Sequence, residues 1–335
     1  MPKVLQKSLP YKVEKYILEN GLIERGDHIF VALSGGADSV CLAEILGGLR
    51  EKLSIKLSAI HYNHKLRGEE SECDEKFVIK YCKDRNIELR VGKKRAGEKI
   101  KSEEDARKLR YAFFEKFLEM ERGSKVALAH QKNDLVETLL LNLVRGTGLR
   151  GLRSIPLSRK FFIRPLLCAR RAEVEEYLAE QNISCQTDKS NFLPVYTRNV
   201  IRHKILPELQ KINPRVVEAL SGLAERADAD YGIIEAVTLE ALKKIKVGKT
   251  SGKVILDQKK YLKIDQKLRP YLLSRVVRDL GIEKDITSTH FRAVDDMIAR
   301  NIGKKSLPLP HSLQVKLIGG KIILSILSKG KYERQ

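Results

Sequence analysis

The sequence predicts an α/β protein: a parallel sheet covered by helices, followed by a smaller, mainly helical domain that ends in a β-hairpin. Apolar runs of strand length alternate with helical patterns through the first 181 residues. Beyond residue 212 the patterns are helical, and the last apolar runs, over 312–326, are separated by Gly319-Gly320. Strand–helix alternation is typical of a parallel sheet with helices on both faces, and a two-glycine turn is typical of a hairpin.

The first domain is expected to begin with a short helix over 12–20, ended by the Asn20-Gly21 pair. Its strands are expected at 27–33, 55–62, 87–91, 125–130 and 161–167. Its further helices are expected at 40–49, 69–85, 102–121, 134–144 and 170–181. Because most of the strands are followed by a helical pattern, the sheet is expected to be covered on both faces.

The pattern changes in a polar, irregular stretch over 184–200. A long helix is then expected over 213–244, with Asn213 as its N-cap and Pro214 in its first turn. Two more helices are expected at 266–280 and 287–301.

The length of 335 residues suits two domains, and the change of pattern divides them into residues 1–210 and 211–335. The hydrophobic fraction of 42% excludes a fully disordered chain. The net charge of +21 favours a polyanionic partner, most often a nucleic acid. The alternative is a generally basic surface with no such partner.

The sequence contains no apolar run of signal-peptide length near its start and no window long enough to span a membrane. Its five cysteines form no CxxC pair, which argues against a disulfide framework, a zinc ribbon and an iron–sulfur site. These observations predict a soluble protein of the reducing cytoplasm with no membrane partner.

The sharpest motif is the loop SGGADS, which directly follows an apolar strand and opens a helix. It consists of Ser34, Gly35, Gly36, Ala37, Asp38 and Ser39. Glycines let backbone N–H groups approach a ligand, and a helix N-terminus adds donors and a positive dipole end. The loop is therefore expected to bind phosphate, although it is neither a Walker A loop nor a dinucleotide GxGxxG motif. The alternative is a tight strand-to-helix turn.

Polar side chains also follow the second strand and lie on the fourth helix. His61 and His64 are placed at the sheet edge where open α/β sheets bind ligands; the alternative is a structural hydrogen bond. Arg107 and Arg110 share one helix face and could neutralise phosphate charge; the alternative is a solvated face.

His130 and Asp134 follow the strand at 125–130 and are spaced to point into the same crevice. Two ligands are too few for a zinc site. Asp134 and Asp38 could instead bind Mg²⁺ together with phosphate oxygens. The alternative is that Asp134 caps its helix, and Asn133 is another candidate cap.

Residues 145–171 contain eight Arg or Lys and no Asp or Glu, and their first half is rich in glycine. A pliable basic segment beside a nucleotide site suits RNA phosphates; the alternative is a solvated basic face. The candidates for RNA or substrate contacts are Arg145, Arg150, Arg153, Asn191, Arg198 and Arg202.

The SGGxDS loop resembles the pyrophosphate-binding PP-loop of the ATP-pyrophosphatases. This resemblance implies a Rossmann-like, five-stranded parallel sheet and cleavage of ATP between its α- and β-phosphates. Further segments, in the same order, resemble the tRNA(Ile)-lysidine synthetase family over about the first 210 residues. They are HYNHKLRGEES (61–71), EEDARKLRY (103–111), AHQKNDLVET (129–138), LVRGTGLRGL (143–152), IRPLL (163–167) and DKSNFLPVYTRNVIRHKILP (188–207).

The resemblance implies roles for the candidate residues. The catalytic set is Asp38, Arg110, His130 and Asp134, with Arg110 on the phosphate side and His130 positioning substrate or transferring a proton. Asp38 and Asp134 are expected to hold Mg²⁺ with the phosphates. Residues 34–39 and His61 are expected to bind ATP and its pyrophosphate. The six candidates for RNA or substrate contacts are expected to contact tRNA or lysine.

The reaction implied is the ATP-dependent joining of free L-lysine to C2 of the wobble cytidine in a tRNA(Ile) with a CAU anticodon. It proceeds through an adenylated cytidine and gives lysidine, AMP and pyrophosphate. The resemblance implies that residues 211–335 face the tRNA, and it leaves a homodimer open. Longer family members carry a further C-terminal domain, which this sequence is expected to lack.

Other readings stay open from the sequence. A different PP-loop tRNA-modifying enzyme, such as a cytidine thiolase, would usually rely on CxxC pairs. GMP and NAD synthetases share the loop but act on small molecules. Such a function would not explain the basic segment at 145–171. A non-catalytic tRNA-binding protein would bind tRNA without ATP turnover.

Overall fold

The computed structural model describes residues 8–66, 68–95, 97–98, 100–121, 123–186, 197–282, 284–301 and 306–327. The chain forms two compact units, Met1–Ala227 and Asp228–Gln335. The division falls within the long helix α10 (Val216–Ile245), later than the boundary at 210 expected from the sequence. The reason is that Val217 and Ala224 of α10 pack into a core cluster of the first unit.

The first unit is built on a sheet whose strand order is β3-β2-β1-β4-β6-β5. The strands are β1 (His28–Ala32), β2 (Lys56–Asn63), β3 (Glu88–Lys93), β4 (Lys125–Ala127), β5 (Ser158–Arg159) and β6 (Phe162–Ile163). Five strands are parallel, as predicted, and the two-residue β5 adds an antiparallel edge. The strand expected at 161–167 is shorter because a 3₁₀ turn begins at Pro165, which has no N–H group for the ladder.

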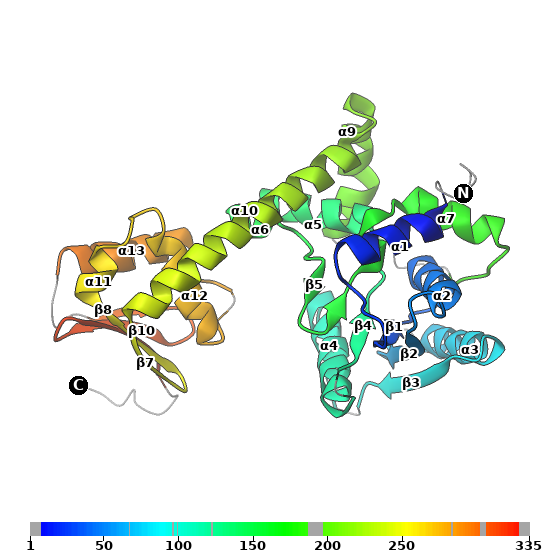
Figure 1. The fold of residues 1–335 in the computed structure, drawn as a ribbon, viewed down its shortest axis with the longest axis horizontal. Helices are drawn as coiled ribbons and strands as arrows, with labels where there is room; N and C mark the ends of the chain where they lie inside the picture. Colours follow the sequence, from blue (N-terminus) through cyan, green and yellow to red (C-terminus); the bar gives the residue numbers. More distant parts are fainter. Residues whose placement is uncertain are drawn as a thin grey trace. The chain divides into compact units, whose positions relative to one another are not determined.

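Helices cover both faces of this sheet (Figure 1). They are α1 (Leu9–Glu19), α2 (Ala37–Leu49), α3 (Glu69–Asp84), α4 (Glu103–Met120) and α7 (Arg171–Glu180). In β1, Ile29 and Val31 pack with α1, α2, α3 and α7, whereas Phe30 between them packs with α4. The alternation of side chains along a buried strand therefore produces two separate cores, one on each face.

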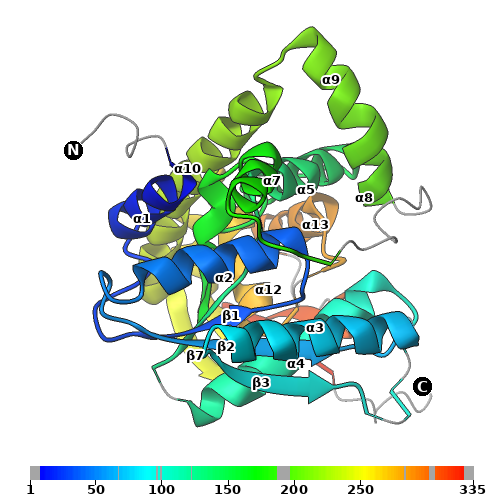
Figure 2. The ribbon, with the colours of Figure 1, turned by 90° about the vertical axis from the view of Figure 1, so that its right-hand side faces the viewer.

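The rest of the first unit continues from β4 through α5 (Lys132–Val144) and α6 (Leu149–Leu152). After α7, one unbroken helical rod contains α8 (Thr197–Val200), a π-helical turn (Ile201–Ile205) and α9 (Leu206–Ile212), as Figure 2 shows. The Asn213 side chain accepts a hydrogen bond from Arg215 N at 2.9 Å just before α10 begins. The prediction of Asn213 as the N-cap is wrong, because the helix begins at Val216 and this contact forms a turn that precedes it.

The second unit contains the predicted helices and a larger sheet than predicted. Its helices beyond α10 are α11 (Gln258–Leu262), α12 (Arg269–Asp279) and α13 (Ser288–Ala299). Its strands are β7 (Lys246–Thr250), β8 (Lys253–Asp257), β9 (Ser306–Leu309), β10 (Leu313–Ile318) and β11 (Lys321–Ile326). The predicted hairpin is β10–β11, whose turn residues Gly319 and Gly320 have φ of 55° and 70°. It forms part of a five-stranded antiparallel sheet in the order β7-β8-β11-β10-β9.

Two composition-based expectations can be compared with this structure. All five cysteines are free thiols in this structure. Among the helices of the described residues, none has the length and apolarity needed to cross a bilayer.

Candidate active site

A pocket of about 770 Å³ opens at the carboxyl ends of β1, β2 and β4. β1 has β2 as its neighbour on one side and β4 on the other, so the strand order reverses direction at β1. The pocket therefore lies at the topological switch point of the sheet. Of the predicted site residues, the following line it: Ser34, Gly36, Ala37, Asp38, Ser39, His61, Arg110, His130 and Arg202. Residues widely spaced in the sequence are therefore brought together as predicted.

The loop 34–39 is shaped by its glycines and by two serine side chains. Gly35 has a φ of +90°, which non-glycine residues rarely adopt, and a Cβ there would lie 3.3 Å from the Phe77 ring. The Ser39 hydroxyl donates to Gly36 O at 2.9 Å and accepts from Ser34 N at 3.1 Å. Gly36 is the N-cap of α2 and has no side chain to cap the first-turn N–H groups, which leaves them for an anion.

A second segment braces this loop from outside. Gln186 N donates to Gly35 O at 2.9 Å, and the two segments form a parallel bridge between Gly36 and Gln186. The stretch after α7 therefore returns to the phosphate-binding loop, and Cys185 and Gln186 line the pocket with it. Sequence reasoning missed this wall because nothing local in residues 184–186 indicates where they pack.

Asp38 lies in the first turn of α2. Burial, followed by the negative charge of Asp134, raises the pKa of Asp38 to about 7. Arg171 and Arg202 act in the opposite direction. Burial, followed by the charge of Glu137, also raises the pKa of Asp134. A buried carboxyl group whose ionisation is opposed by a neighbouring carboxylate forms a site that a cation would stabilise.

Asp134 also caps its own helix, the alternative that the sequence left open. Gln131 N donates to Asp134 Oδ2 at 3.1 Å, and Gln131 is the N-cap of α5. The expectation that Asn133 caps this helix is wrong, because the helix already begins at Lys132. The Asn133 side chain instead accepts from Arg171 N at 3.2 Å, linking the starts of α5 and α7. Asp134 is not among the described residues that line the pocket.

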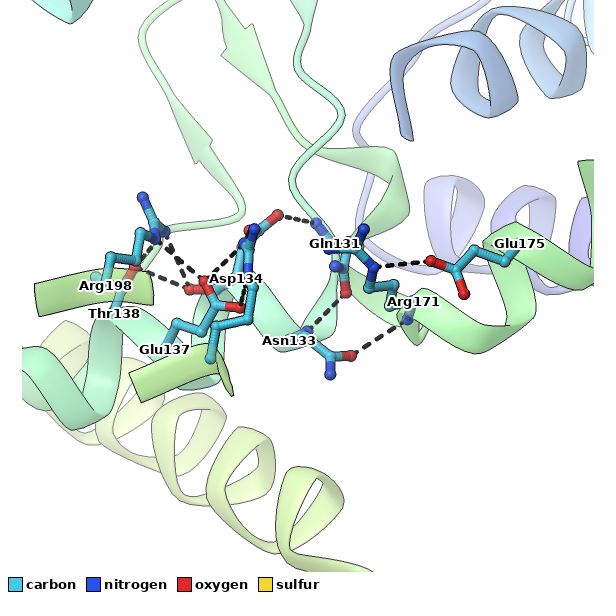
Figure 3. A network of polar contacts seen from close by, with 9 residues as sticks. Gln131, Asn133, Asp134, Glu137, Thr138, Arg171, Glu175 and Arg198 are labelled. Atoms are coloured by element: carbon cyan, nitrogen blue, oxygen red, sulfur yellow. Dashed lines mark hydrogen bonds and ion pairs between the residues drawn. The ribbon is translucent and has the colours of Figure 1, made fainter. Parts of the chain in front are cut away.

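Glu137 is the centre of a buried ion-pair network that sequence reasoning missed. Its side chain is only 1% exposed. Arg202 donates to both of its carboxylate oxygens, at 2.6 and 2.8 Å, and to Asp134 Oδ1 at 3.2 Å. Arg198 donates to Glu137 at 3.2 Å and to the Thr138 hydroxyl at 3.0 Å. Figure 3 shows Arg198 and Glu137 turned toward each other beside Asp134.

A sequence signal for this network exists in retrospect. Asp134 and Glu137 are three residues apart on one helix, and Arg198 and Arg202 are four apart on another. Matched spacings of acids and bases favour two helices that pair through one face each. The predicted arginines are thus held by protein carboxylates, and Arg202 also reaches the pocket.

His130 is surrounded by positive charge. Burial, and then the charges of four arginines, hold the pKa of His130 well below its usual range; the arginines are Arg164, Arg107, Arg110 and Arg198. The imidazole is therefore neutral at physiological pH. Its Nδ1 atom is buried and makes no hydrogen bond among the described residues.

Arg164 makes the largest cationic contribution to this field, and it is a buried member of the basic segment over 145–171 rather than a solvated or RNA-facing one. Its residue is 3% exposed, and its Nη1 donates to Pro156 O at 2.7 Å. A hydrogen bond with Tyr111 also involves its side chain. This guanidinium therefore acts within the unit, through its charge, rather than as a direct RNA contact.

Replacing Arg164 with methionine is expected to raise the pKa of His130 toward 6.5 without reaching it. The variant removes the largest cationic contribution, whereas burial remains. A ¹³C-histidine NMR titration, with the His130 signal assigned from a His130→Gln variant, measures the shift. Arg50→Met, at the end of α2, is the control and should leave this pKa unchanged. An unchanged or lower His130 pKa in Arg164→Met would contradict the assignment.

The remaining candidates lie in different surroundings. Arg145 and Arg150 are exposed at the end of α5 and in α6, and Arg153 is half-buried, so none of the three lines the pocket. Asn191 lies outside the described residues. The pocket also has Arg171, Glu175 and His203 in its wall, which the sequence did not single out.

Comparisons with known proteins show the family of this chain. The model of the PP-loop domain matches residues 5–209. The chain is 36% identical to tRNA(Ile)-lysidine synthase of Clostridium perfringens over 297 residues, covering 86% of this chain and 62% of that protein. It is 32% identical to the tRNA(Ile)-lysidine synthase of Clostridioides difficile over 322 residues, covering 94% and 70%. It thus spans less than two thirds of the length of the first of these relatives.

A solved structure supports the fold alone. The U34-tRNA thiolase NcsA from Methanococcus maripaludis with its [4Fe-4S] cluster matches with a TM-score of 0.54 and 19% identity, over 65% of this chain and 76% of that chain. The PP-loop match and the extent of the C. difficile alignment confirm the resemblance inferred from the motifs. The chain belongs to the PP-loop proteins and, within them, to the tRNA(Ile)-lysidine synthase family.

Proposed function

We propose that this chain joins free lysine to C2 of the wobble cytidine of a tRNA(Ile) with a CAU anticodon, at the expense of ATP. The observation that carries the proposal is the glycine loop at the start of α2, which opens onto the same pocket as Asp38, Arg110 and His130. The relatives that align over most of the chain are named for this product.

The first half-reaction needs charge neutralisation and alignment. The cytidine O2 attacks the α-phosphorus of ATP, the bond to the β-phosphate oxygen breaks, and pyrophosphate leaves. Backbone N–H groups at Gly36 and in the first turn of α2 are suited to hold the departing pyrophosphate. The Arg110 guanidinium, in the wall of the same pocket, neutralises phosphate charge.

Mg²⁺ belongs to this proposal as a partner of ATP. Asp38 and Asp134 would hold it, because the charge of Asp134 raises the pKa of Asp38 and a cation between them would relieve this repulsion. When bound, it supplies further neutralisation of phosphate charge. Among the described residues no group of three or more His, Cys, Asp or Glu is arranged to hold a metal ion.

The second half-reaction replaces AMP by an amine. The lysine Nε attacks C2, the C2–O bond breaks, AMP leaves, and the nitrogen loses its proton. A neutral His130 in the pocket wall is suited to position the amine or accept that proton.

The tRNA contacts stay predictions. Exposed Arg145 and Arg150 beside the first unit's pocket-bearing helices, and the basic second unit, suit RNA phosphates. Unpaired anticodon bases can be splayed out and read by their edges. The cytidine-thiolase alternative is not favoured, because this sequence has no CxxC pair. A homodimer and a cytoplasmic location also stay predictions.

Pyrophosphate release tests the proposal against its alternatives. The protein is incubated with ATP and Mg²⁺, alone, with a CAU-anticodon tRNA(Ile) transcript, or with the same transcript carrying UAU. Release only with the CAU transcript is expected. Release without RNA would favour a small-molecule synthetase, and tRNA binding with no release would favour a non-catalytic binding protein.

A further inference from the structure

His61 is fixed in one orientation by the strand that precedes the phosphate-binding loop. Its residue is 5% exposed. Its Nδ1 lies 2.7 Å from Leu33 O. A carbonyl oxygen can only accept, so Nδ1 carries the proton and donates. The other ring nitrogen, Nε2, is shielded from solvent and makes no hydrogen bond among the described residues.

The ring is neutral, which defines what Nε2 can do. Burial lowers the pKa of His61, and Lys93 adds to this, against the opposing effects of the Leu33 hydrogen bond, Glu75 and Asp74. With Nδ1 protonated in a neutral imidazole, Nε2 holds a lone pair and acts only as an acceptor. A buried acceptor without a partner destabilises a protein, so its retention calls for an explanation.

His61 is one of the residues that line the pocket, so a nucleotide bound there is the source of a partner for Nε2. A lone pair repels phosphate oxygens, so His61 does not suit the pyrophosphate role that the sequence predicted for it. The donors of a bound ATP lie on its nucleoside, as the 6-amino group of the base and the two ribose hydroxyls.

The surroundings of His61 also match a nucleoside. His61 lies on β2, which is on one side of β1 in the sheet. The Asp134–Glu137 network follows β4, which is on the other side of β1. Apolar side chains of the same region line the pocket there: Ile60, Tyr62 and Leu66. An apolar wall with one fixed acceptor is the arrangement expected for orienting a base and sugar.

We infer that His61 Nε2 accepts a hydrogen bond from a donor on the nucleoside half of ATP, and that His61 is a specificity-determining residue for the nucleotide. This inference rests on the proposed function in one respect, namely that ATP occupies this pocket. The histidine orients the nucleoside while the loop at 34–39 holds the phosphates.

Calorimetric binding of nucleotides, without tRNA or lysine, tests this inference. The ligands are ATP, 2′-deoxyATP, 3′-deoxyATP and purine riboside triphosphate, each lacking one donor relative to ATP. Wild-type protein is expected to bind one analogue about 10-fold more weakly than ATP, because that analogue leaves Nε2 unpaired. The identity of that analogue distinguishes the base amine from either hydroxyl.

His61→Asn is the informative variant. Its amide NH₂ replaces Nδ1–H against Leu33 O but offers nothing at the position of Nε2. It is expected to bind ATP about 10-fold more weakly and to bind the discriminated analogue as well as ATP, within about twofold. Its ratios for the other analogues should equal those of the wild type.

His28→Asn is the matched control. His28 begins β1, its Nε2 lies 2.9 Å from the Ser58 hydroxyl, and it is not among the described residues that line the pocket. It should bind all four nucleotides as the wild type does. Equal wild-type affinity for all four ligands, or an unchanged set of ratios in His61→Asn, would overturn the inference.

The outcomes separate this inference from the proposed function. The expected binding pattern in a protein that releases no pyrophosphate with CAU tRNA would support the role of His61 and reject the ligase. Absence of ATP binding by the wild type would reject both.

Discussion

Asp38→Asn is expected to lower the rate of tRNA-dependent pyrophosphate release by about 100- to 1,000-fold while the chain stays folded. Asparagine has nearly the same shape but cannot carry the negative charge that holds a cation beside the reacting phosphates. Asp38 lines the pocket in the first turn of α2, and no other described carboxylate in the loop at 34–39 can replace it. Asp84→Asn, on the exposed end of α3, is the control and should keep wild-type turnover. Wild-type turnover in Asp38→Asn would reject the assignment.

The pKa of about 7 for Asp38 gives this variant a distinctive pH signature. In the free enzyme the carboxylate forms only as the pH rises through that value, so kcat/KM of the wild type should rise through about 7. The residual activity of Asp38→Asn should lack this step.

The free energy of unfolding of the wild type should fall as the pH rises through the same range in which kcat/KM increases. The folded pKa of Asp38 is about 7 and the unperturbed value is 3.8, so folding takes up a proton between these pH values. The stability that the neutral acid contributes is present below the lower value and is lost as the pH rises to the higher one. Asp38→Asn does not ionise, so its thermal midpoint should exceed that of the wild type at pH 7.5, and the difference should shrink toward pH 4. A less stable variant at pH 7.5 would contradict the burial of this charge.

Glu137→Gln is expected to lower the free energy of unfolding of the first unit by about 2–4 kcal/mol. The variant leaves Arg202 and Arg198 without the buried carboxylate that both contact. The Arg202 side chain is 18% exposed, so its guanidinium stays partly hydrated. The free-energy cost of losing its partner is therefore smaller than for a fully buried ion pair. Urea denaturation followed by circular dichroism measures the loss.

The control is Glu208→Gln, which removes an exposed pair with Lys211 in α9. Its expected cost is below about 1 kcal/mol, because exposed pairs contribute little. Equal costs for the two variants would show that the Glu137 network does not stabilise the start of the α8–α9 rod against α5.

The first unit was largely predictable because local patterns and global fold agree there. Each strand such as His28–Ala32 is apolar and is followed by a periodic helix, so strand pairing follows from the right-handed crossover rule. The loop at 34–39 was predictable because two glycines between an apolar strand and a helix are typical of a phosphate-binding turn. The φ of +90° at Gly35 is the conformation for which glycine is needed there. Its partner segment, Cys185-Gln186, was not, since its place depends on tertiary packing.

The second unit was less predictable for the same physical reasons. Strands such as Lys246–Thr250 and Ser306–Leu309 are short, and their side chains are mostly exposed, so they show weak alternation. Their pairing is fixed by neighbouring strands rather than by their own sequence. The hairpin was visible because its two strands alternate clearly around Gly319-Gly320.

Charge roles were the least predictable feature of the site. Arg164 and Glu137 read as ordinary surface charges in the sequence, yet they are 3% and 1% exposed. Burial of a charge depends on partners distant in the chain, here Tyr111 and Arg202, and no local pattern reveals them.

One incubation tests the proposed reaction most directly. The protein is combined with ATP, Mg²⁺, radiolabelled lysine and an unmodified tRNA(Ile) transcript with a CAU anticodon, and the tRNA is then deacylated under mild alkali. Label that stays on the tRNA, and that requires ATP, is the predicted result. It distinguishes a lysine bonded to the base from an alkali-labile aminoacyl ester. Pyrophosphate release with no stable label would show that the amine is not lysine, and would contradict the proposed function.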